Sequence, residues 1–283
     1  MGDVGEPHGG NLTGTRLATD PEVPLSPFRV RGAELACEYS DEGGHPVVQL
    51  HGLTSSRARD RLLDLDLGRG QSGTRLLRYD ARGHGRSTGC PLPEDYRWSR
   101  LAEDLLALVE AYFPGEAVHG VGPSMGCGTL LHAAVREPDR FDGLTLLLPP
   151  TAWETRAAQA RDYERLAAFV ERHGAERLAG AGASLHALPP AAASHPPATP
   201  DVAERLLPAA YRGAALSDLP SRQELAGLRL PVSILAWTGD GGHPVSTALS
   251  LARVLPRARL RIAERPEQVA AWPEVLREDV GRD

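Results

Sequence analysis

Apolar residues recur along this chain in two alternating patterns. Short apolar runs predict buried strands, whereas apolar residues three and four positions apart predict helices. Strands are expected at residues 33–39, 46–50, 75–79, 117–122, 144–148, 231–236 and 258–262, the first of them antiparallel. Helical spacing is clearest over residues 98–112 and 125–135. Repeated strand–helix units of this kind predict an α/β fold, with a mostly parallel sheet and helices on both faces.

A long stretch without strand signals interrupts the alternation between residues 149 and 230. Its first part, residues 151–172, has helical periodicity, whereas residues 188–200 are rich in proline and predict an extended connector. An insertion at this point would lie over the carboxyl ends of the strands, where open α/β sheets bind ligands. We therefore expect a flexible N-terminal arm at residues 1–26 and a helical cap, or lid, at residues 151–228. The core would consist of residues 27–150 together with residues 229–283.

The pentapeptide Gly122-Pro123-Ser124-Met125-Gly126 matches the pattern G-x-S-x-G between an expected strand and an expected helix. In that context the pattern predicts a nucleophile elbow, a turn so sharp that the serine backbone is strained and its Oγ projects above the sheet. The N–H of Met125, at a helix N-terminus, can then donate to an oxyanion. Ser124 is therefore the candidate nucleophile.

Two further motifs occur at the ends of expected strands. Leu50-His51-Gly52-Leu53 ends one strand, and the segment from Asp80 to Ser87, which reads DARGHGRS, follows the next. Together with the elbow, they resemble the α/β-hydrolase fold superfamily, in its esterase, lactonase and C–C hydrolase branch with a helical cap. The resemblance covers roughly residues 28–280. Motifs of this kind specify the fold far better than the substrate.

The resemblance implies a set of site residues. The backbone N–H groups of Leu53 and Met125 would form the oxyanion hole, while His51 and His84 would hold loops rather than exchange protons. The triad acid would be Asp240, which follows the strand after the cap. An N-cap for the helix that starts near residue 245 is the other interpretation of Asp240.

The same resemblance places a catalytic histidine after the last strand, but residues 259–268 contain none. Without a base, a serine hydroxyl is a poor nucleophile at neutral pH. Triad members act as a unit, so the loss of one costs several powers of ten in rate. The sequence therefore predicts weak or absent hydrolysis of ordinary activated esters, and slow labelling of Ser124.

Several residues could substitute for the missing base. His243 is the best placed and is the candidate base, but it is only three residues beyond Asp240, so packing of its ring within its own loop is the simpler expectation. Glu264 would need burial to raise its pKa, and a solvent-facing role is the simpler expectation. Among the remaining histidines, we expect two to be packed in the core, His119 and His132. Three others belong to the expected cap, namely His173, His186 and His195.

Composition narrows the function further. The chain has 283 residues, a formal net charge of −6 and no lysine, which excludes Schiff-base and lysine-nucleophile mechanisms. The chain has only three cysteines, which predicts no disulfide framework. Its polar start and the lack of a long apolar run predict a soluble cytoplasmic protein. No metal, cofactor, nucleic acid or membrane partner is expected. Arg57, Arg59 and Arg61 are expected to form a solvated helix face.

Three classes of function fit these observations, all with a small-molecule substrate or ligand; the oligomeric state stays open. The first is a serine hydrolase of small esters, lactones or related carbonyl compounds, with an atypical base or none. The second is a non-hydrolytic enzyme, such as a cyclase, lyase or isomerase, that uses the pocket and the oxyanion hole. The third is a ligand-binding protein with a degenerate site. The persistence of Ser124 in its expected strained turn favours the hydrolase.

Overall fold

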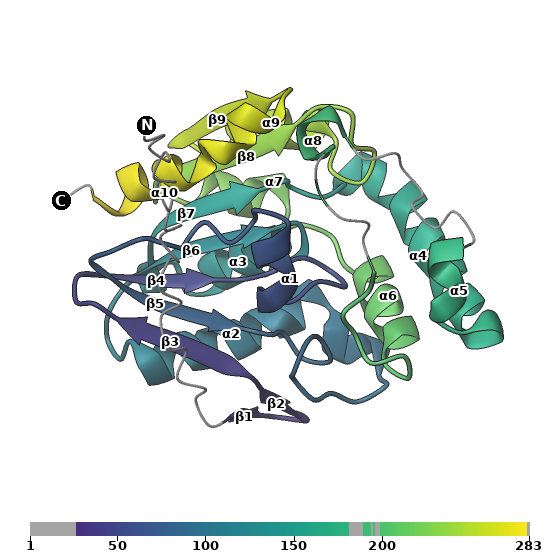
Figure 1. Ribbon diagram of the computed structural model, residues 1–283. Coiled ribbons are helices and arrows are strands. Elements are labelled where there is room, and N and C mark those ends of the chain that lie inside the picture. The colour runs from purple at the N-terminus through teal and green to yellow at the C-terminus, as the bar shows by residue number, and fades with distance from the viewer. Residues whose placement is uncertain (1–26, 181–188, 194, 196–198, 282–283) are drawn as a thin grey trace, which may run out of the picture.

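The computed structural model describes residues 27–180, 189–193, 195 and 199–281, and the expected N-terminal arm lies outside this range. Seven strands form the central sheet in the order β3-β5-β4-β6-β7-β8-β9 (Figure 1). Only β3 runs antiparallel to its neighbour. The strand bounds are β3 Cys37–Asp41, β4 His45–Gln49, β5 Thr74–Tyr79, β6 Val118–Pro123, β7 Phe141–Leu147, β8 Val232–Trp237 and β9 Ala258–Ala263. The mostly parallel sheet of the expected α/β fold is confirmed.

The single strand expected at residues 33–39 is instead divided in two. β1 (Phe28–Val30) and β2 (Ala33–Leu35) form a separate hairpin, and β3 begins at Cys37. The break falls at Ala36, whose N–H donates to Ser87 Oγ at 2.8 Å instead of to a neighbouring strand. A side chain from a distant loop thus ends the ladder at a point where the apolar pattern continues.

Helices cover both faces of the sheet (Figure 1). One face packs against α2, α3 and α8, and the apolar residues between them form the main core. The other face carries α1, α9 and α10, with a second core around Trp237 and Trp272. The bounds are α1 Arg57–Leu62, α2 Trp98–Tyr112, α3 Met125–Arg136, α8 Val245–Val254, α9 Pro266–Ala270 and α10 Trp272–Val280. The short 3-10 helices η1 (Pro93–Tyr96) and η2 (Pro138–Arg140) precede α2 and β7.

The chain between β7 and β8 is helical over its described residues. It contains η3 Trp153–Thr155, α4 Arg156–His173, α5 Glu176–Gly180, η4 Pro190–Ala192, α6 Leu207–Ala215 and α7 Arg222–Ala226. α4 and α6 share a small apolar core, which also includes Tyr96 of η1 and has Leu53 packed against it. Leu225 of α7, by contrast, belongs to the main core. The proline-rich connector expected at residues 188–200 therefore includes one helical turn, η4, while residues 188, 194 and 196–198 lie outside the described residues.

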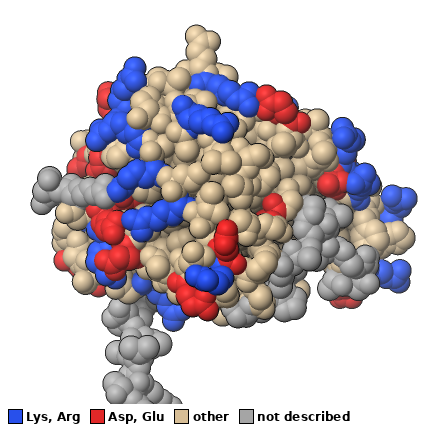
Figure 2. All heavy atoms as spheres, turned by 90° about the horizontal axis from the view of Figure 1, so that it is seen from above, with Lys and Arg blue, Asp and Glu red and all other residues tan. Residues whose placement is uncertain are grey.

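Charged side chains of both signs lie interspersed on the face shown in Figure 2. This mixture agrees with the modest net charge of −6. Among the described helices, none combines the length and the apolar character that a membrane span requires.

Candidate active site

Ser124 lies at the turn between β6 and α3, with the backbone of a nucleophile elbow. Its φ is 51° and its ψ is −109°, a conformation that residues with a Cβ atom rarely adopt. The turn is held by Ser124 N–H, which donates to Leu147 O in the neighbouring strand at 2.9 Å. The structure thus places the Ser124 side chain at the carboxyl edge of the parallel sheet, where the sequence predicted it.

The two glycines of the motif are required by close packing. A Cβ atom on Gly122 would lie 3.0 Å from Leu50 Cβ, and one on Gly126 would lie 3.1 Å from the same atom. β4 therefore approaches the elbow closely. The loop after β4 does so too, because a Cβ on Gly52 would lie 3.7 Å from Ser124 Cβ. Side chains at these positions would push the loop between β4 and α1, residues 50–56, away from the serine; we call it the HG loop after His51 and Gly52.

His243 lies between Ser124 and Asp240. Its Nε2 is 2.8 Å from Ser124 Oγ, and its Nδ1 is 2.8 Å from Asp240 Oδ2. A carboxylate can only accept, so Nδ1 carries the proton and Nε2 is free to accept from the serine hydroxyl. The expectation that His243 would only pack within its own loop is wrong. The three side chains form a continuous hydrogen-bonded chain.

The Asp240 carboxylate itself shapes the loop that makes this contact possible. Asp240 Oδ1 accepts the N–H groups of Gly242 and His243, at 2.9 and 3.2 Å. This turn folds the loop back on the carboxylate and so brings the imidazole beside it. The N–H of Thr151, just beyond β7, donates to Gly242 O at 3.0 Å and fastens the loop to the adjacent segment.

Asp240 is also held by Trp237, the last residue of β8. The indole Nε1–H donates to Asp240 Oδ2 at 2.8 Å, a contact that sequence reasoning missed. Burial alone would raise the pKa of Asp240, but the interactions with His243 and Trp237 outweigh it and hold that pKa well below its ordinary value. Asp240 is therefore ionised at neutral pH and suited to orient and stabilise a protonated His243.

The loop after β9, where the resemblance would place a histidine, contributes no side chain to the hydrogen bonds among Ser124, His243 and Asp240. Glu264, Arg265 and Pro266 are all exposed. The N–H groups of Glu264 and Arg265 both donate to Gln268 Oε1, which starts the short helix α9. Glu264 is therefore solvent-facing, as expected.

The two amides proposed for an oxyanion hole flank the serine. Met125 is the first residue of α3, and the N–H groups of a first helical turn have no acceptor within the helix. Leu53 directly follows Gly52, which lies against the serine. Within the described residues, neither Leu53 N–H nor Met125 N–H has an acceptor. Both donors are thus available to a ligand at the end of β4 and β6.

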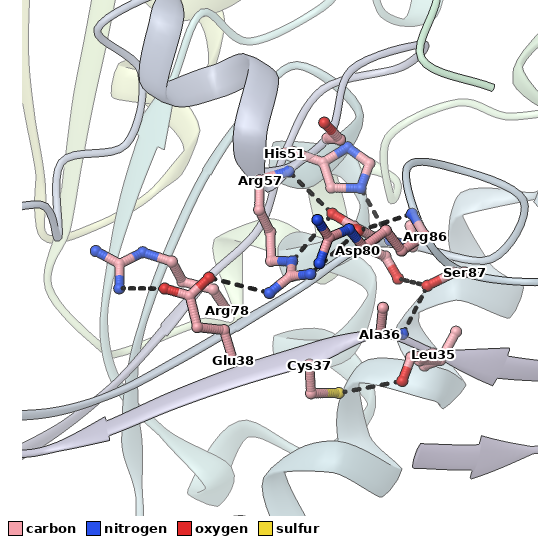
Figure 3. A network of polar contacts seen from close by, with 12 residues as sticks. Leu35, Ala36, Cys37, Glu38, His51, Arg57, Arg78, Asp80, Arg86 and Ser87 are labelled. Atoms are coloured by element: carbon pink, nitrogen blue, oxygen red, sulfur yellow. Dashed lines mark hydrogen bonds and ion pairs between the residues drawn. The ribbon is translucent and has the colours of Figure 1, made fainter. Parts of the chain in front are cut away.

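A buried polar network supports the HG loop from below (Figure 3). His51 Nε2 accepts the N–H of Ala81 at 2.8 Å, so its Nδ1–H donates to Gly52 O, also at 2.8 Å. Burial lowers the pKa of His51 and keeps the ring neutral. Asp80 accepts the backbone N–H and the guanidinium of Arg57, at 3.0 and 3.1 Å. These contacts tie the HG loop to the loop after β5.

The same network corrects the expectation for the arginine cluster. Arg57 and Arg61 do not form a solvated face, since their side chains are only 13% and 21% exposed and both pair with Glu38. Arg61 also pairs with Asp66 at 3.1 Å. The partners come from β3 and from the loop after α1, elements whose position could not be predicted from the helical pattern.

Other histidines considered from the sequence contact partners away from Ser124. His84 Nδ1 lies 2.9 Å from Arg82 O, His119 contacts Thr145, His132 contacts Asp218, His173 packs on Phe169, and His195 lies near Asp64 and Trp237. His186 is outside the described residues.

The helical segment between β7 and β8 contacts the core through Arg156 of α4. The guanidinium is buried, and it donates to Ser217 O at 2.7 Å and stacks 4.3 Å above the Trp98 ring. Burial lowers the pKa of Arg156. Two helical turns further on, Tyr163 stacks on Tyr211 of α6. Burial raises the pKa of Tyr163, and the positive charge of Arg156, which lies 5.4 Å from the centre of its ring, opposes that rise.

A surface hollow of about 380 Å³ lies elsewhere, between α4, α6 and the segment before α2. Its lining is partly charged and includes the ion pair of Glu171 with Arg212. None of its lining residues belongs to the hydrogen-bonded chain at Ser124, so this hollow is not the site described above.

A model of the α/β hydrolase fold family matches residues 45–206, more than half of the chain. The chain therefore belongs to the α/β hydrolase fold family. A curated relative, the probable lysophospholipase BODYGUARD 2 of Arabidopsis thaliana, is 32% identical over 121 residues. That alignment spans 41% of this chain and only 25% of the relative.

Solved structures agree on the fold over nearly the whole chain. A hydrolase from Pseudomonas aeruginosa PA01 is 22% identical, with a TM-score of 0.72 over 94% of this chain and 100% of that chain. A thermophilic esterase from Thermogutta terrifontis is 23% identical, with a TM-score of 0.68 over 92% and 99%. The enol-lactonase from Burkholderia xenovorans LB400 is 21% identical, with a TM-score of 0.62 over 88% and 97%.

Proposed function

We propose that this chain is a serine hydrolase of small esters, lactones or related carbonyl compounds, with Ser124 as nucleophile, His243 as base and Asp240 as acid. The observation that carries the proposal is the chain of two 2.8 Å hydrogen bonds from Ser124 through His243 to Asp240. Similarity to an esterase and an enol-lactonase, at 23% and 21% identity, supports the fold on which the proposal rests.

The geometry supports an acyl-transfer mechanism in which all protons are accounted for. Ser124 Oγ attacks the carbonyl carbon while its proton passes to His243 Nε2. The N–H groups of Leu53 and Met125 stabilise the negative charge that develops on the carbonyl oxygen. When the tetrahedral intermediate collapses, His243 Nε2 returns the proton to the departing alcohol oxygen. A water then repeats the sequence on the acyl-enzyme, releasing the acid and restoring Ser124.

This arrangement reverses the expectation of slow labelling that followed from the missing histidine. A fluorophosphonate should label Ser124 rapidly in the parent chain, because its hydroxyl has a base within hydrogen-bond distance. The variant His243→Ala should label at least about a hundred times more slowly. His173→Ala, which removes an exposed cap histidine, is the matched control and should label like the parent.

The outcomes distinguish the classes of function. Fast labelling that His243→Ala leaves unchanged would show that another group is the base. Negligible labelling of the parent would contradict an activated serine and favour binding or non-covalent catalysis. Ser124→Ala, assayed with the true ligand, would then separate those two.

A further inference from the structure

A short piece of the cap runs between the loop after β4, which lies against Ser124, and the loop after β5. We call residues 199–202, which lie between η4 and α6, the strap. Asp201 N–H donates to Thr54 O in the HG loop at 2.8 Å, and Asp201 O accepts the N–H of Gly85 at 2.8 Å. The next residue, Val202, pairs with His84 as an antiparallel bridge. The strap therefore joins the loop after β4 to the loop after β5.

The side chain of Asp201 adds a third bond. Asp201 Oδ2 accepts the hydroxyl of Ser56 at 2.6 Å, across 145 positions of the chain. Ser56 is only 1% exposed, and its Oγ also accepts the N–H of Arg59 as the N-cap of α1. The carboxylate thus holds the residue at which the HG loop ends and α1 starts.

The loop between these anchors has a conformation that needs support. Thr54 has a φ of 60°, a left-handed backbone conformation that costs about 1 kcal/mol or more for a β-branched residue. Ser55 donates its hydroxyl to Asp60 at 2.5 Å, so two consecutive serines of this loop donate to two different aspartates. Leu53, the proposed oxyanion donor, lies between Gly52, which faces Ser124, and Thr54, which the strap holds.

We propose that Asp201 is a positioning residue, through which the cap holds the Leu53 N–H in place for the oxyanion. This inference rests on the proposed hydrolase function. An N–H donor that is displaced by about 0.5–1 Å loses most of the stabilisation that it gives the transition state. The loop that carries it must therefore be held tightly. The oxyanion forms only during the reaction, and a displaced donor therefore lowers kcat while KM changes little.

The test compares three variants of the full chain with p-nitrophenyl acetate as the ester. Asp201→Ala removes the acceptor for Ser56 Oγ and should lower kcat about tenfold, less than the loss of a whole oxyanion donor, with KM within about twofold. Asp201→Asn keeps an acceptor oxygen and should restore most of kcat. Thr199→Ala is the matched control, because it removes a strap contact to Arg59 of α1 and leaves Ser56 and Thr54 untouched.

Hydrogen exchange provides a readout that does not require activity. Asp201→Ala should accelerate exchange in the peptide covering residues 51–57, whose Ser55 and Arg57 amides are hydrogen-bonded, whereas Thr199→Ala should not. An inactive parent in which Asp201→Ala still accelerates this exchange would contradict the hydrolase function and support the strap. An active parent in which Asp201→Ala and Thr199→Ala behave alike in kcat and in exchange would overturn the inference.

If Asp201→Ala does not fold, Ser56→Ala removes the same bond from its other side. It should also lower kcat about tenfold with little change in KM, beyond the stability lost with the α1 N-cap. A normal kcat in folded Ser56→Ala would overturn the inference as well.

Discussion

Asp240 and His243 are three residues apart, and the carboxylate of the first accepts the Nδ1–H of the second at 2.8 Å. The proposed acid and base therefore share one loop between β8 and α8, and only Ser124 comes from elsewhere. The same carboxylate accepts two N–H groups of its own loop, so it orients the imidazole both directly and through the backbone. The loop after β9 contributes no residue to this chain of contacts.

Asp240→Asn should reduce kcat by about three to four powers of ten with KM nearly unchanged. The amide would present either an oxygen or an NH₂ group to His243, and the NH₂ orientation would stabilise the wrong imidazole tautomer. Steady-state kinetics on p-nitrophenyl acetate measure the effect. Glu264→Gln is the matched control, since this carboxylate is exposed in the loop after β9. An equal loss in both variants would contradict the assignment of the acid.

Trp237→Phe should lower kcat about tenfold. It removes the indole N–H that donates to Asp240 Oδ2, and a hydrogen bond to a charged group contributes about 1.5–3 kcal/mol. The pKa of Asp240 should rise in this variant. Trp272→Phe is the control, because Trp272 is buried and stacks on Trp237 at 6.0 Å. Both variants should lose similar thermal stability, but kcat should fall in Trp237→Phe alone; a parallel fall would assign the effect to packing.

The elbow could be predicted from the sequence because its cause is local. Gly122 and Gly126 are required wherever β4 and the start of α3 approach the turn this closely, so the pattern carries its own steric reason. The parallel sheet was predictable for a similar reason, since each buried strand shows its apolar run. The break at Ala36 was not, because a distant serine side chain causes it.

The proposed base, His243, could not be assigned from the sequence because its position depends on a loop conformation. The segment Asp240-Gly241-Gly242-His243 does carry a signal, since a carboxylate that binds backbone N–H groups two and three residues later forms a tight turn. That signal alone does not say which way the imidazole points. The bond between Asp201 and Ser56 has no local signal at all, and the partners of Arg57 and Arg61 likewise come from other elements.

Ser124→Gly should be more stable than Ser124→Ala by about 1 kcal/mol. Both substitutions remove Oγ, but only glycine adopts the φ of 51° without a steric cost. The difference between the two variants therefore isolates the backbone strain at the elbow. Urea unfolding at one pH measures the two free energies. If the Ser124→Ala variant were instead the more stable of the two, as alanine is over glycine at an unstrained position, the backbone of Ser124 would not be strained.

Asp60 should make the stability of the protein depend on pH near neutrality. Its carboxyl is 2% exposed, and within the described residues its Oδ2 has no hydrogen-bond partner. Burial raises the pKa of Asp60 to about 7, against the hydrogen bond from Ser55, which lowers it. Between about pH 4 and pH 7 the folded chain thus keeps a proton that the unfolded chain has lost. The free energy of unfolding must then fall as pH rises through this window and level off above it.

The size of this effect follows from about 1.4 kcal/mol for each unit of pKa difference, so roughly 2–3 kcal/mol should be lost between pH 5 and pH 8. Asp60→Asn cannot ionise but can still accept the hydroxyl of Ser55, so its unfolding free energy should lack this slope. Urea unfolding at pH 5, 6, 7 and 8 measures it. Asp64→Asn, at a side chain that is 73% exposed, should keep the slope of the parent. If the unfolding free energies of the parent and of Asp60→Asn had the same dependence on pH, Asp60 would be ionised in the folded protein throughout this range. Ser55 and Ser56 of the HG loop would then each donate to a charged carboxylate.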